Sequence, residues 1–332
     1  MRRVGNLMET VTSFPNLLAA WRRAAKGKRD RRSVTRFFRD LERELLRLRR
    51  ELVDGSYRPG GYRTFTIHDP KERVISMPPF RDRVVHHEII GVLSPVLEAR
   101  FDADSYGCRK GRGMDRALRR AVDLARRNEW CLKTDVHKFY ESIDHEVVLG
   151  QVARIVKDRR LLALLSRIVR GGAHGLPIGS LTSQWLANLN LTPLDRALRL
   201  SRHVKGQVRY MDDVLVFGES RTGMRAALGE IQSLLADELG LRLKETVTRI
   251  GETRRGIAFL GFRIRPEGLS IRRQTFRLFV RGVRRAESAY RTGRCSDTDL
   301  AASVTSRLAH LSRARTRALV IKTFEKWPEM MW

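Results

Sequence analysis

The sequence predicts an α+β fold, because helical and strand-like patterns are mixed along the chain without the regular strand–helix–strand alternation of a parallel sheet. Its 332 residues are 42% hydrophobic and 31% charged, so the chain can bury a sizeable core. The length predicts two or three subdomains. No internal repeat or low-complexity linker interrupts the chain, and we therefore expect a mixed globular protein.

The first quarter of the chain predicts a helical region followed by a hairpin. Residues 7–53 are predicted to be helical, since apolar side chains recur there at helical spacing and Gly55 supplies a stop. Residues 57–77 instead alternate apolar and polar side chains around an Asp-Pro-Lys-Glu sequence. This alternation predicts two strands joined by a charged turn.

The middle of the chain returns to helical patterns. Residues 81–101 and 114–128 predict two helices, joined by a connection that holds three glycines among basic side chains. Free amides and basic groups at a helix start suit an anion, although an ordinary flexible loop explains the same residues equally well. Residues 130–136 predict a short buried strand, which is followed by a polar-aromatic turn and by helices as far as Arg170.

The remaining segments complete the mixed pattern. Residues 207–218 predict a strand, a tip and a second strand, and residues 221–240 predict a helix. Residues 241–250 and 256–264 have the apolar alternation of strands, and the chain from about Gln274 onward has the 3.6-residue period of helices.

The net charge indicates a polyanionic partner. The chain holds 66 Lys and Arg against 37 Asp and Glu, a formal charge of +29, and residues 22–32 alone hold seven basic side chains and one acidic. Such a charge repels itself unless an anion neutralises it, and arginine forks suit phosphate contacts. A solvated basic surface is the alternative. An anionic membrane would also fit, but the sequence shows no anchor.

Cysteine, histidine and hydropathy patterns exclude other classes. The three cysteines do not describe a disulfide framework, and a zinc motif begun at His87 would need histidine where Gly91 stands. No uninterrupted apolar stretch of about 18 residues and no signal peptide is found. We expect a soluble, cytoplasmic protein of a bacterial or phage-infected cell.

Three carboxylates carry the chemistry that the sequence predicts. Asp212 and Asp213 lie between two apolar strand-like runs, and Asp135 ends the short strand that begins at Trp130. Adjacent anions at the edge of a core repel each other unless a cation lies between them, although a solvated turn is the simpler interpretation of the pair. If the strands are neighbours in one sheet, the three carboxylates would hold two Mg²⁺ ions for in-line phosphoryl transfer.

Read in order, several segments resemble the successive palm motifs of a reverse transcriptase: KTDVHKFYESIDH, GLPIGSLTSQ, RYMDDVLVF, LGLRLKETV and IAFLGFRI. The segments PKERVISMPPFRDRVV and SYGCRKGRG resemble fingers motifs of group II intron and related bacterial enzymes. The resemblance covers nearly the whole chain. It implies an RNA-directed DNA polymerase that binds template RNA, the RNA/cDNA duplex and dNTPs.

The resemblance also implies a right-hand polymerase architecture. We expect a basic helical N-terminal region (1–56), fingers (57–118), and a palm (119–270) with an antiparallel sheet and helices on one face. Part of the fingers would be inserted at about 148–178. The last segment, 271–332, is long enough for a small helical thumb but not for a maturase, RNase H or endonuclease domain.

The resemblance implies roles for individual residues. It places two Mg²⁺ ions, with Mn²⁺ as a substitute, on Asp135, Asp212 and Asp213, and it adds the carbonyl of Val136 as a ligand. It assigns dNTP contacts to Lys71, Arg73, Arg109, Tyr140, Ile178, Gly179, Gln184 and Lys244, and a primer grip to Phe259, Leu260 and Gly261. Tyr140 would be the steric gate. The structural alternatives are a core aromatic for Tyr140, an exposed charged hairpin for Lys71 and Arg73, and an apolar strand turn for the primer-grip residues.

One departure from the common motif indicates a subtype. Most reverse transcriptases have Gln-Gly and then Ser-Pro where this chain has Ile178-Gly179 and then Ser183-Gln184. This pattern resembles diversity-generating retroelement enzymes, which copy a template-repeat RNA with frequent errors at adenine and work with a small oligomeric accessory protein. Ile178 offers apolar contact where glutamine would hydrogen-bond, so we expect it to loosen discrimination at template adenine.

Two alternatives stay open at the level of the sequence. A group II-like or abortive-infection-type reverse transcriptase would use another template or none. A basic RNA-binding scaffold with a vestigial palm would bind RNA without incorporating nucleotides.

Overall fold

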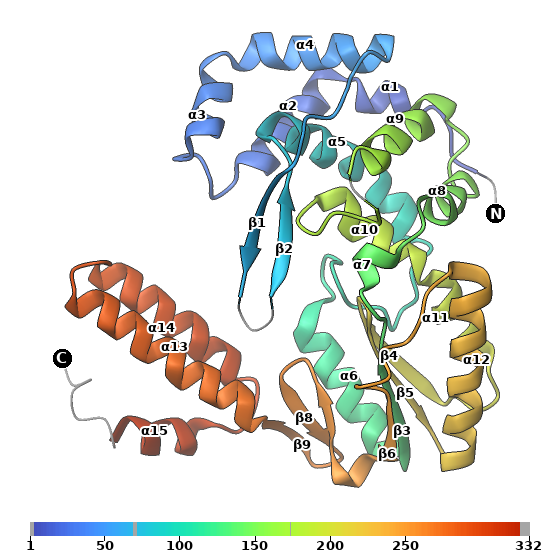
Figure 1. Cartoon of the computed structure of the whole chain (residues 1–332), viewed down its shortest axis with the longest axis vertical. Coiled ribbons are helices and arrows are strands. Elements are labelled where there is room, and N and C mark those ends of the chain that lie inside the picture. The colour runs from blue at the N-terminus through green and yellow to red at the C-terminus, as the bar shows by residue number, and fades with distance from the viewer. Residues whose placement is uncertain (1–2, 69–71, 173, 326–332) are drawn as a thin grey trace. The chain divides into compact units, whose positions relative to one another are not determined.

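The computed structural model describes residues 3–68, 72–172 and 174–325, and the chain forms two compact units (Figure 1). Unit 1 comprises Met1–Arg109, Val136–Ala197 and Glu230–Lys244, and unit 2 comprises Lys110–Asp135, Leu198–Gly229 and Glu245–Trp332. Each unit is therefore assembled from stretches that are distant in the sequence.

Unit 1 is built mainly from helices. They are α1 (Leu7–Val11), α2 (Phe14–Ala25), α3 (Arg32–Arg39), α4 (Leu41–Asp54), α5 (Phe80–Glu98), α7 (Phe139–Ser142), α8 (His145–Ala153), α9 (Arg159–Arg170) and α10 (Leu181–Asn190). Two further helices, α11 (Thr192–Leu200) and α12 (Arg221–Leu239), run from one unit into the other. The unit also holds strands β1 (Arg63–Ile67) and β2 (Arg73–Met77).

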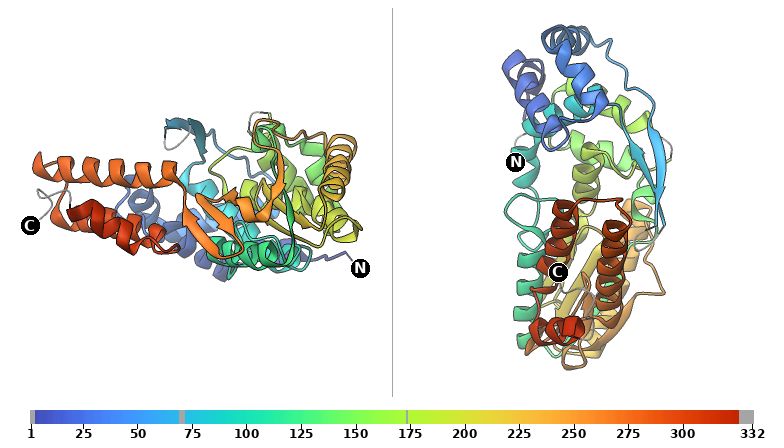
Figure 2. Two further views of the ribbon diagram at one scale, coloured as in Figure 1. Left: turned by 90° about the horizontal axis from the view of Figure 1, so that it is seen from below. Right: turned by 90° about the vertical axis from the view of Figure 1, so that its left-hand side faces the viewer.

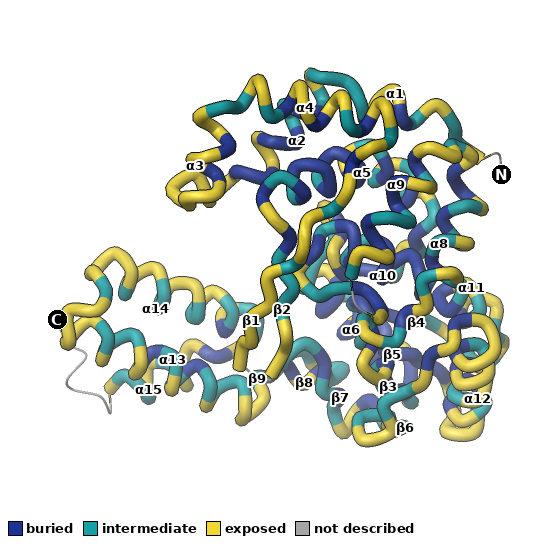
Figure 3. Tube along the Cα trace, turned by 45° about the horizontal axis from the view of Figure 1, so that its top comes forward, coloured by how far each residue is buried: buried dark blue, intermediate teal, exposed yellow. Residues whose placement is uncertain are grey.

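Helix α5 is the centre of the core of unit 1. Its 19 residues are apolar on several faces, and Val84, Val85, Ile89, Leu93 and Leu97 are fully buried. A helix that is apolar nearly all round must be enclosed by neighbours. Helices α1, α2, α3 and α10 pack against it, and its trace is mostly dark blue in Figure 3. The His-His-Glu sequence that lacks the spacing of a zinc motif belongs to this buried helix.

The predicted hairpin is confirmed. Strands β1 and β2 pair in antiparallel fashion from Arg63 opposite Met77 to Ile67 opposite Arg73, and most of their residues are exposed. Residues 69–71 of the charged turn, including Lys71, lie outside the described residues.

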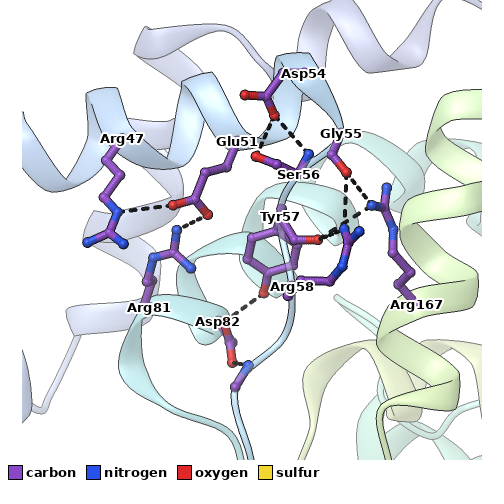
Figure 4. Close-up of polar contacts among 11 residues, drawn as sticks. Arg47, Glu51, Asp54, Gly55, Ser56, Tyr57, Arg58, Arg81, Asp82 and Arg167 are labelled. Carbon is purple, nitrogen blue, oxygen red and sulfur yellow. Dashed lines mark hydrogen bonds and ion pairs between the residues drawn. The ribbon is translucent and has the colours of Figure 1, made fainter.

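The root of this hairpin is fixed by a buried polar network (Figure 4). Tyr57 is fully buried, and its hydroxyl donates to Asp82 Oδ1 at 2.7 Å. The other oxygen of Asp82 accepts from the Gly60 amide at 2.7 Å. Arg81 lies over the Tyr57 ring and forms an ion pair with Glu51. Burial and the nearby Asp82 charge raise the pKa of Tyr57, so its hydroxyl remains a donor.

Unit 2 contains two antiparallel sheets. The first has the order β4-β5-β3-β6 and is formed by β3 (Trp130–Asp135), β4 (Gly206–Tyr210), β5 (Asp213–Gly218) and β6 (Arg249–Glu252). The second has the order β7-β8-β9 and is formed by β7 (Ile257–Phe259), β8 (Phe262–Arg265) and β9 (Gly268–Ile271). Helix α6 (Gly113–Arg127) packs against strands of both sheets, and the short 3₁₀ helix η1 (Thr253–Arg255) links β6 to β7.

The C-terminal part of unit 2 is helical, as predicted. Helices α13 (Arg273–Arg291) and α14 (Asp297–Leu311) lie side by side in Figures 1 and 2, and α15 (Arg317–Glu325) follows them. Phe279, Val283 and Leu311 form their buried cluster, against which Phe276 and Phe324 pack. The basic residues of α13 are therefore left on its other faces.

The structure corrects three local predictions and confirms the mixed class. Of the predicted strand 241–250, only its end joins a sheet, as part of β6, while Leu243 forms a single bridge with Val136. The polar-aromatic turn contains the short helix α7, and the strand β9 was not predicted. Every pair of named strands in the described residues is antiparallel. No helix in this part of the chain is long and apolar enough to cross a membrane.

The Tyr57–Asp82 hydrogen bond supplies a first prediction. Replacing Tyr57 by Phe keeps the ring but leaves the buried Asp82 oxygen without its hydroxyl donor, which should cost about 1–3 kcal/mol of unfolding free energy. Urea denaturation of Tyr57→Phe measures this cost. The matched control is Tyr290→Phe, because Tyr290 is 44% exposed and the change should stay within about 0.5 kcal/mol. Equal effects of the two changes would contradict the role of the buried network.

Candidate active site

Strand pairing brings two of the predicted carboxylates together. Strands β3 and β5 are antiparallel neighbours, and Asp135 is directly opposite Asp213 in their register. Directly opposite residues share a face of the sheet and have Cβ atoms about 5 Å apart. The predicted neighbourhood of the two strands is confirmed, and the sheet places both residues at the same end of unit 2.

The third carboxylate lies in the turn beside them. Tyr210 is opposite Asp213 in the β4–β5 pair, so Met211 and Asp212 form a two-residue connection. Met211 has a φ of 57°, in the left-handed region that residues other than glycine seldom adopt. The tight turn explains why Asp212 and Asp213 are held at the tip of the sheet as predicted.

A lysine that sequence reasoning missed provides the nearest cation. Lys133 Nζ lies 3.6 Å from Asp213 Oδ1. The signal was present in the sequence, because Lys133 precedes Asp135 by two residues and a strand alternates its faces with a period of two. Lys133 therefore shares the face of Asp135 and Asp213. Its ammonium offsets part of the repulsion between these carboxylates.

The environment of Asp213 raises its pKa to about 7. Burial is the main cause, the charges of Asp135 and Asp212 add to it, and Lys133 acts in the opposite direction. The side chain is 22% exposed overall, but its Oδ1 atom is fully buried. Within the described part of the chain this oxygen has no hydrogen-bond partner, and the Lys133 ammonium at 3.6 Å is an ion-pair contact beyond hydrogen-bond distance. A buried carboxylate oxygen without a donor is suited to a cation.

The predicted convergence into a ready-made metal pocket is not present. Within residues 3–68, 72–172 and 174–325, no group of three or more His, Cys, Asp or Glu side chains is close enough to hold a metal ion. Carboxylates repel one another unless cations lie between them. Lys133 supplies one positive charge where two divalent ions would supply four, so the repulsion is only partly offset. The chemistry of these side chains nevertheless fits Mg²⁺. The carboxylates of Asp135 and Asp213 share one face, and the buried Asp213 Oδ1 has an ion-pair contact with Lys133 but no hydrogen bond from the described residues.

Unit 1 holds the loop that contains Ile178 and Gly179. The Ile178 carbonyl accepts a hydrogen bond from the Ser76 amide of β2 at 2.7 Å. Gly179 has a φ of 114°, and a Cβ atom there would lie 3.0 Å from the Ser76 oxygen and 2.9 Å from Ile75. Only glycine fits this approach. The structure therefore joins the predicted specificity loop to the hairpin, and Gln184 follows on α10 with partial exposure.

The two aromatic candidates for the steric gate are separated by the structure. Phe139 is buried, while Tyr140 is partly exposed and its ring contacts that of Phe139 at 5.7 Å between centroids. Phe139 is thus the core aromatic. The role of Tyr140 as the steric gate stays a prediction. Val136, the first residue of unit 1 after Asp135, is buried.

The predicted basic contacts differ in their surroundings. Arg73 is exposed on β2. Arg109 instead is held inside unit 1: its guanidinium lies 2.7 Å from Glu98, donates to the Ser105 carbonyl at 2.7 Å and stacks on Phe101. These partners explain Arg109 as a structural residue, so a contact with the triphosphate would require their release. Lys244 is partly buried after the Leu243 bridge.

The predicted primer grip forms the turn between β7 and β8. Phe259 and Phe262 pair across it and are fully buried, whereas Leu260 and Gly261 both have positive φ values, 46° and 89°. Two consecutive left-handed residues are typical of a type I′ hairpin turn. The Gly261 carbonyl accepts from Thr275 Oγ1 at 2.8 Å, so the turn is tied to α13.

The end of the sheet combines two opposed carboxylates, Asp135 and Asp213, with a third in the adjoining tight turn. A family model for reverse transcriptase (RNA-dependent DNA polymerase) matches residues 67–264. The chain belongs to this family, and its class of activity is RNA-directed DNA polymerase. Enzymes of the family generally use divalent metal ions, typically Mg²⁺.

Individual relatives agree with the family assignment. Protein YkfC of Escherichia coli (strain K12) is 26% identical over 271 residues, which cover 67% of this chain and 71% of YkfC. Group II intron-encoded protein LtrA of Lactococcus lactis subsp. cremoris is 25% identical over 168 residues, or 47% of this chain and 28% of LtrA. Nuclear intron maturase 1, mitochondrial, of Arabidopsis thaliana is 36% identical over 88 residues, which cover 26% of this chain and 12% of the maturase.

The chain thus spans most of YkfC but less than a third of the two intron-related proteins. Among solved structures, apo telomerase from Candida tropicalis has a TM-score of 0.49 and 13% identity, over 64% of this chain and 48% of that chain.

The elevated pKa of Asp213 makes stability depend on pH. The folded chain binds this proton more strongly than the unfolded chain, whose pKa is 3.8, so unfolding free energy should fall between about pH 4 and 7. The slope is at most about 1.4 kcal/mol per pH unit. Asp213→Asn should lose this part of the slope in urea denaturation at pH 5, 6 and 7.5. Asp123→Asn, at an exposed carboxylate of α6, should keep it. Parallel profiles of all three proteins would contradict the elevated pKa.

Proposed function

We propose that the chain is the reverse transcriptase of a diversity-generating retroelement, which copies a template-repeat RNA into cDNA with frequent errors at adenine. The observation that carries the polymerase chemistry is the register of β3 and β5, with Asp135 opposite Asp213 beside the turn that holds Asp212. The retroelement subtype rests on Ile178-Gly179 and Ser183-Gln184 in place of the commoner motif.

In this proposal, Asp135, Asp212 and Asp213 hold two Mg²⁺ ions, with the Val136 carbonyl as a further ligand. The ions would supply activation of the primer hydroxyl and stabilisation of the leaving pyrophosphate. Lys133 keeps Asp213 paired while the site has no ion, and its flexible stem lets the ammonium move aside. Asp213 must release any proton it holds before it can act as a ligand.

The residues of unit 1 would bind and select the nucleotide. Arg73 and Lys71 would contact the triphosphate from the hairpin, and Tyr140 would exclude a 2′-hydroxyl. The Ser76–Ile178 hydrogen bond fixes the Ile178 backbone, so the apolar side chain is presented in a defined position while it offers no hydrogen bond to a base. Selection at this position would then rest on shape alone, which discriminates weakly.

The basic helices at the N-terminus would bind template RNA, and α13 to α15 would be a thumb that follows the RNA/cDNA duplex. Helices α2 and α3 carry Arg22, Arg23, Arg36 and Arg39 in their last turns. Such side chains contact phosphates without regard to sequence. An oligomeric accessory protein is the expected partner of this subtype.

A group II-like reverse transcriptase is the second candidate, and the similarity to LtrA and to an intron maturase favours it. Primer extension on defined RNA, with and without a co-encoded accessory protein, separates the two. A neighbouring template repeat and a matching adenine-variable repeat support the retroelement. Faithful copying of adenine without such repeats supports the second candidate.

The three carboxylates supply a test of the polymerase activity. Asp213→Asn should lower Mg²⁺-dependent dNTP incorporation by about 10³-fold or more, because several kcal/mol of transition-state charge stabilisation are lost. Affinity for RNA should stay within about threefold, since it depends on basic side chains elsewhere. Asp123→Asn is the matched control and should keep full incorporation. An inactive wild-type chain that still binds RNA would instead support the RNA-binding scaffold.

Ile178 supplies a test of the error-prone copying. In Ile178→Gln the new amide can hydrogen-bond to the nascent pair, so misincorporation opposite template adenine should fall by on the order of tenfold relative to other template bases. Ile178→Val keeps an apolar side chain and should retain the adenine bias. Sequencing of cDNA made on one RNA measures both spectra. If glutamine leaves the adenine errors unchanged, Ile178 does not set them.

A further inference from the structure

We propose that Arg209 is a positioning residue that holds the Tyr210–Asp213 turn in its active conformation. This inference rests on the polymerase activity proposed above and adds a residue to which no role was assigned. Arg209 lies on β4 and is only 1% exposed. Its Nη1 donates to the carbonyl of Met211 at 3.2 Å, inside the turn that carries Asp212 and Asp213.

The turn needs such support because its first residue is strained. Met211 is buried and has a φ of 57°, a backbone conformation that is unfavourable for a residue with a Cβ atom. Nothing longer than two residues joins Tyr210 to Asp213, so the connection cannot relax without breaking the register of the strands. A hydrogen bond from a charged donor is stronger than one between neutral groups, so the contact from Arg209 offsets part of this cost.

The position of Arg209 separates its role from that of Lys133. Arg209 is opposite Val214, whereas Tyr210 is opposite Asp213, so Arg209 lies on the other face of the sheet from Asp213. Lys133 shares the face of the carboxylates and contacts Asp213 directly. The Arg209 guanidinium instead contacts the turn from the opposite face of the sheet, through the Met211 carbonyl of the peptide that precedes Asp212. It orients the carboxylates without occupying the space where substrate and ions would bind.

This assignment predicts a pattern that a merely space-filling arginine would not give. If Arg209 acts by holding left-handed Met211, then a residue that adopts this conformation easily should compensate for its loss. Asparagine visits the left-handed region more readily than alanine or methionine does. The two positions should therefore be coupled in a double-mutant cycle, and the sign of the coupling should depend on the residue at 211.

The experiment combines Arg209→Met with Met211→Asn and, as the matched comparison, with Met211→Ala. Arg209→Met should lower kcat for primer extension about 10–100-fold, as expected for carboxylates displaced by about 1 Å, while KM for primer–template changes less than about threefold. Met211→Asn in the same chain should recover at least about fivefold of kcat, and Met211→Ala should recover none. Arg126→Met is the control, because Arg126 donates to the Pro266 carbonyl away from the turn and its loss should leave kcat unchanged.

A second readout does not depend on activity. Hydrogen exchange in a peptide covering residues 207–218 should accelerate in Arg209→Met and slow again when Met211→Asn is added. If Arg209→Met does not fold, Arg209→Lys replaces it, since lysine keeps the charge but lacks the planar fork. Equal recovery by asparagine and alanine, or no recovery by either, would overturn the role of Arg209. A wild-type chain without polymerase activity would overturn the proposed function alone, and the exchange pattern would still decide the role of Arg209.

Discussion

The antiparallel pairing of β3 with β5 is the constraint on which the site depends. It converts two residues separated by 78 positions in the chain into direct neighbours, Asp135 and Asp213. Strand β5 buries five consecutive residues and β3 buries three of its six, and a slip of one residue would move Lys133 and Asp135 to the other face of the sheet. The carboxylates are therefore placed by the hydrophobic register of their strands. Their own electrostatics opposes the arrangement.

This opposition explains the polar surroundings of the site. Carboxylates that the sheet forces together must either bind protons or find cations. In unit 2 the Lys133 ammonium lies on their face, and the buried Arg209 guanidinium donates to the Met211 carbonyl of the turn from the other face. The left-handed Met211 fits the same logic, because strained backbone persists only where surrounding structure over-determines it. The end of the sheet is thus costly to fold and is suited to cations.

Much of this arrangement could be predicted from the sequence, and the exceptions have physical causes. The strands around Asp135 and Asp213, the hairpin at 57–77 and the C-terminal helices follow local periodicity, which a single sequence reveals. The roles of Arg109 and Lys133 do not follow from local periodicity, because they depend on residues that are distant in the sequence or in another element. An arginine in a glycine-rich loop has the same local pattern whether it binds a phosphate or, as here, Glu98. Lys133 was overlooked because its importance depends on a strand contributed by residues about 80 positions later.

The site also shows what periodicity cannot supply. Strand order places three carboxylates at one end of a sheet. Whether their oxygens come close together depends on the cations that are bound near them. The sequence therefore predicted correctly that the strands of Asp135 and Asp213 are neighbours, while the described residues show no closely gathered group of three carboxylates. Strand β9 is a second example, because its four residues are a strand through their antiparallel pairing with β8, which the local sequence pattern does not reveal.

The exposed β1–β2 hairpin has a consequence for the behaviour of the protein in solution. Two strands alone are marginally stable in water, and this pair forms a sheet of its own in which the side chains of Phe65 and Val74 are exposed. The Ser76 amide of β2 is already bonded to the Ile178 carbonyl, so β1 is the edge more open to pairing. Such a ribbon is a template for intermolecular β-pairing. Arg63 and Arg73, near its two ends, act as gatekeepers against this pairing, and the large positive charge of the chain adds long-range repulsion. Colloidal stability should therefore decline as salt screens that charge, well before the fold itself is weakened.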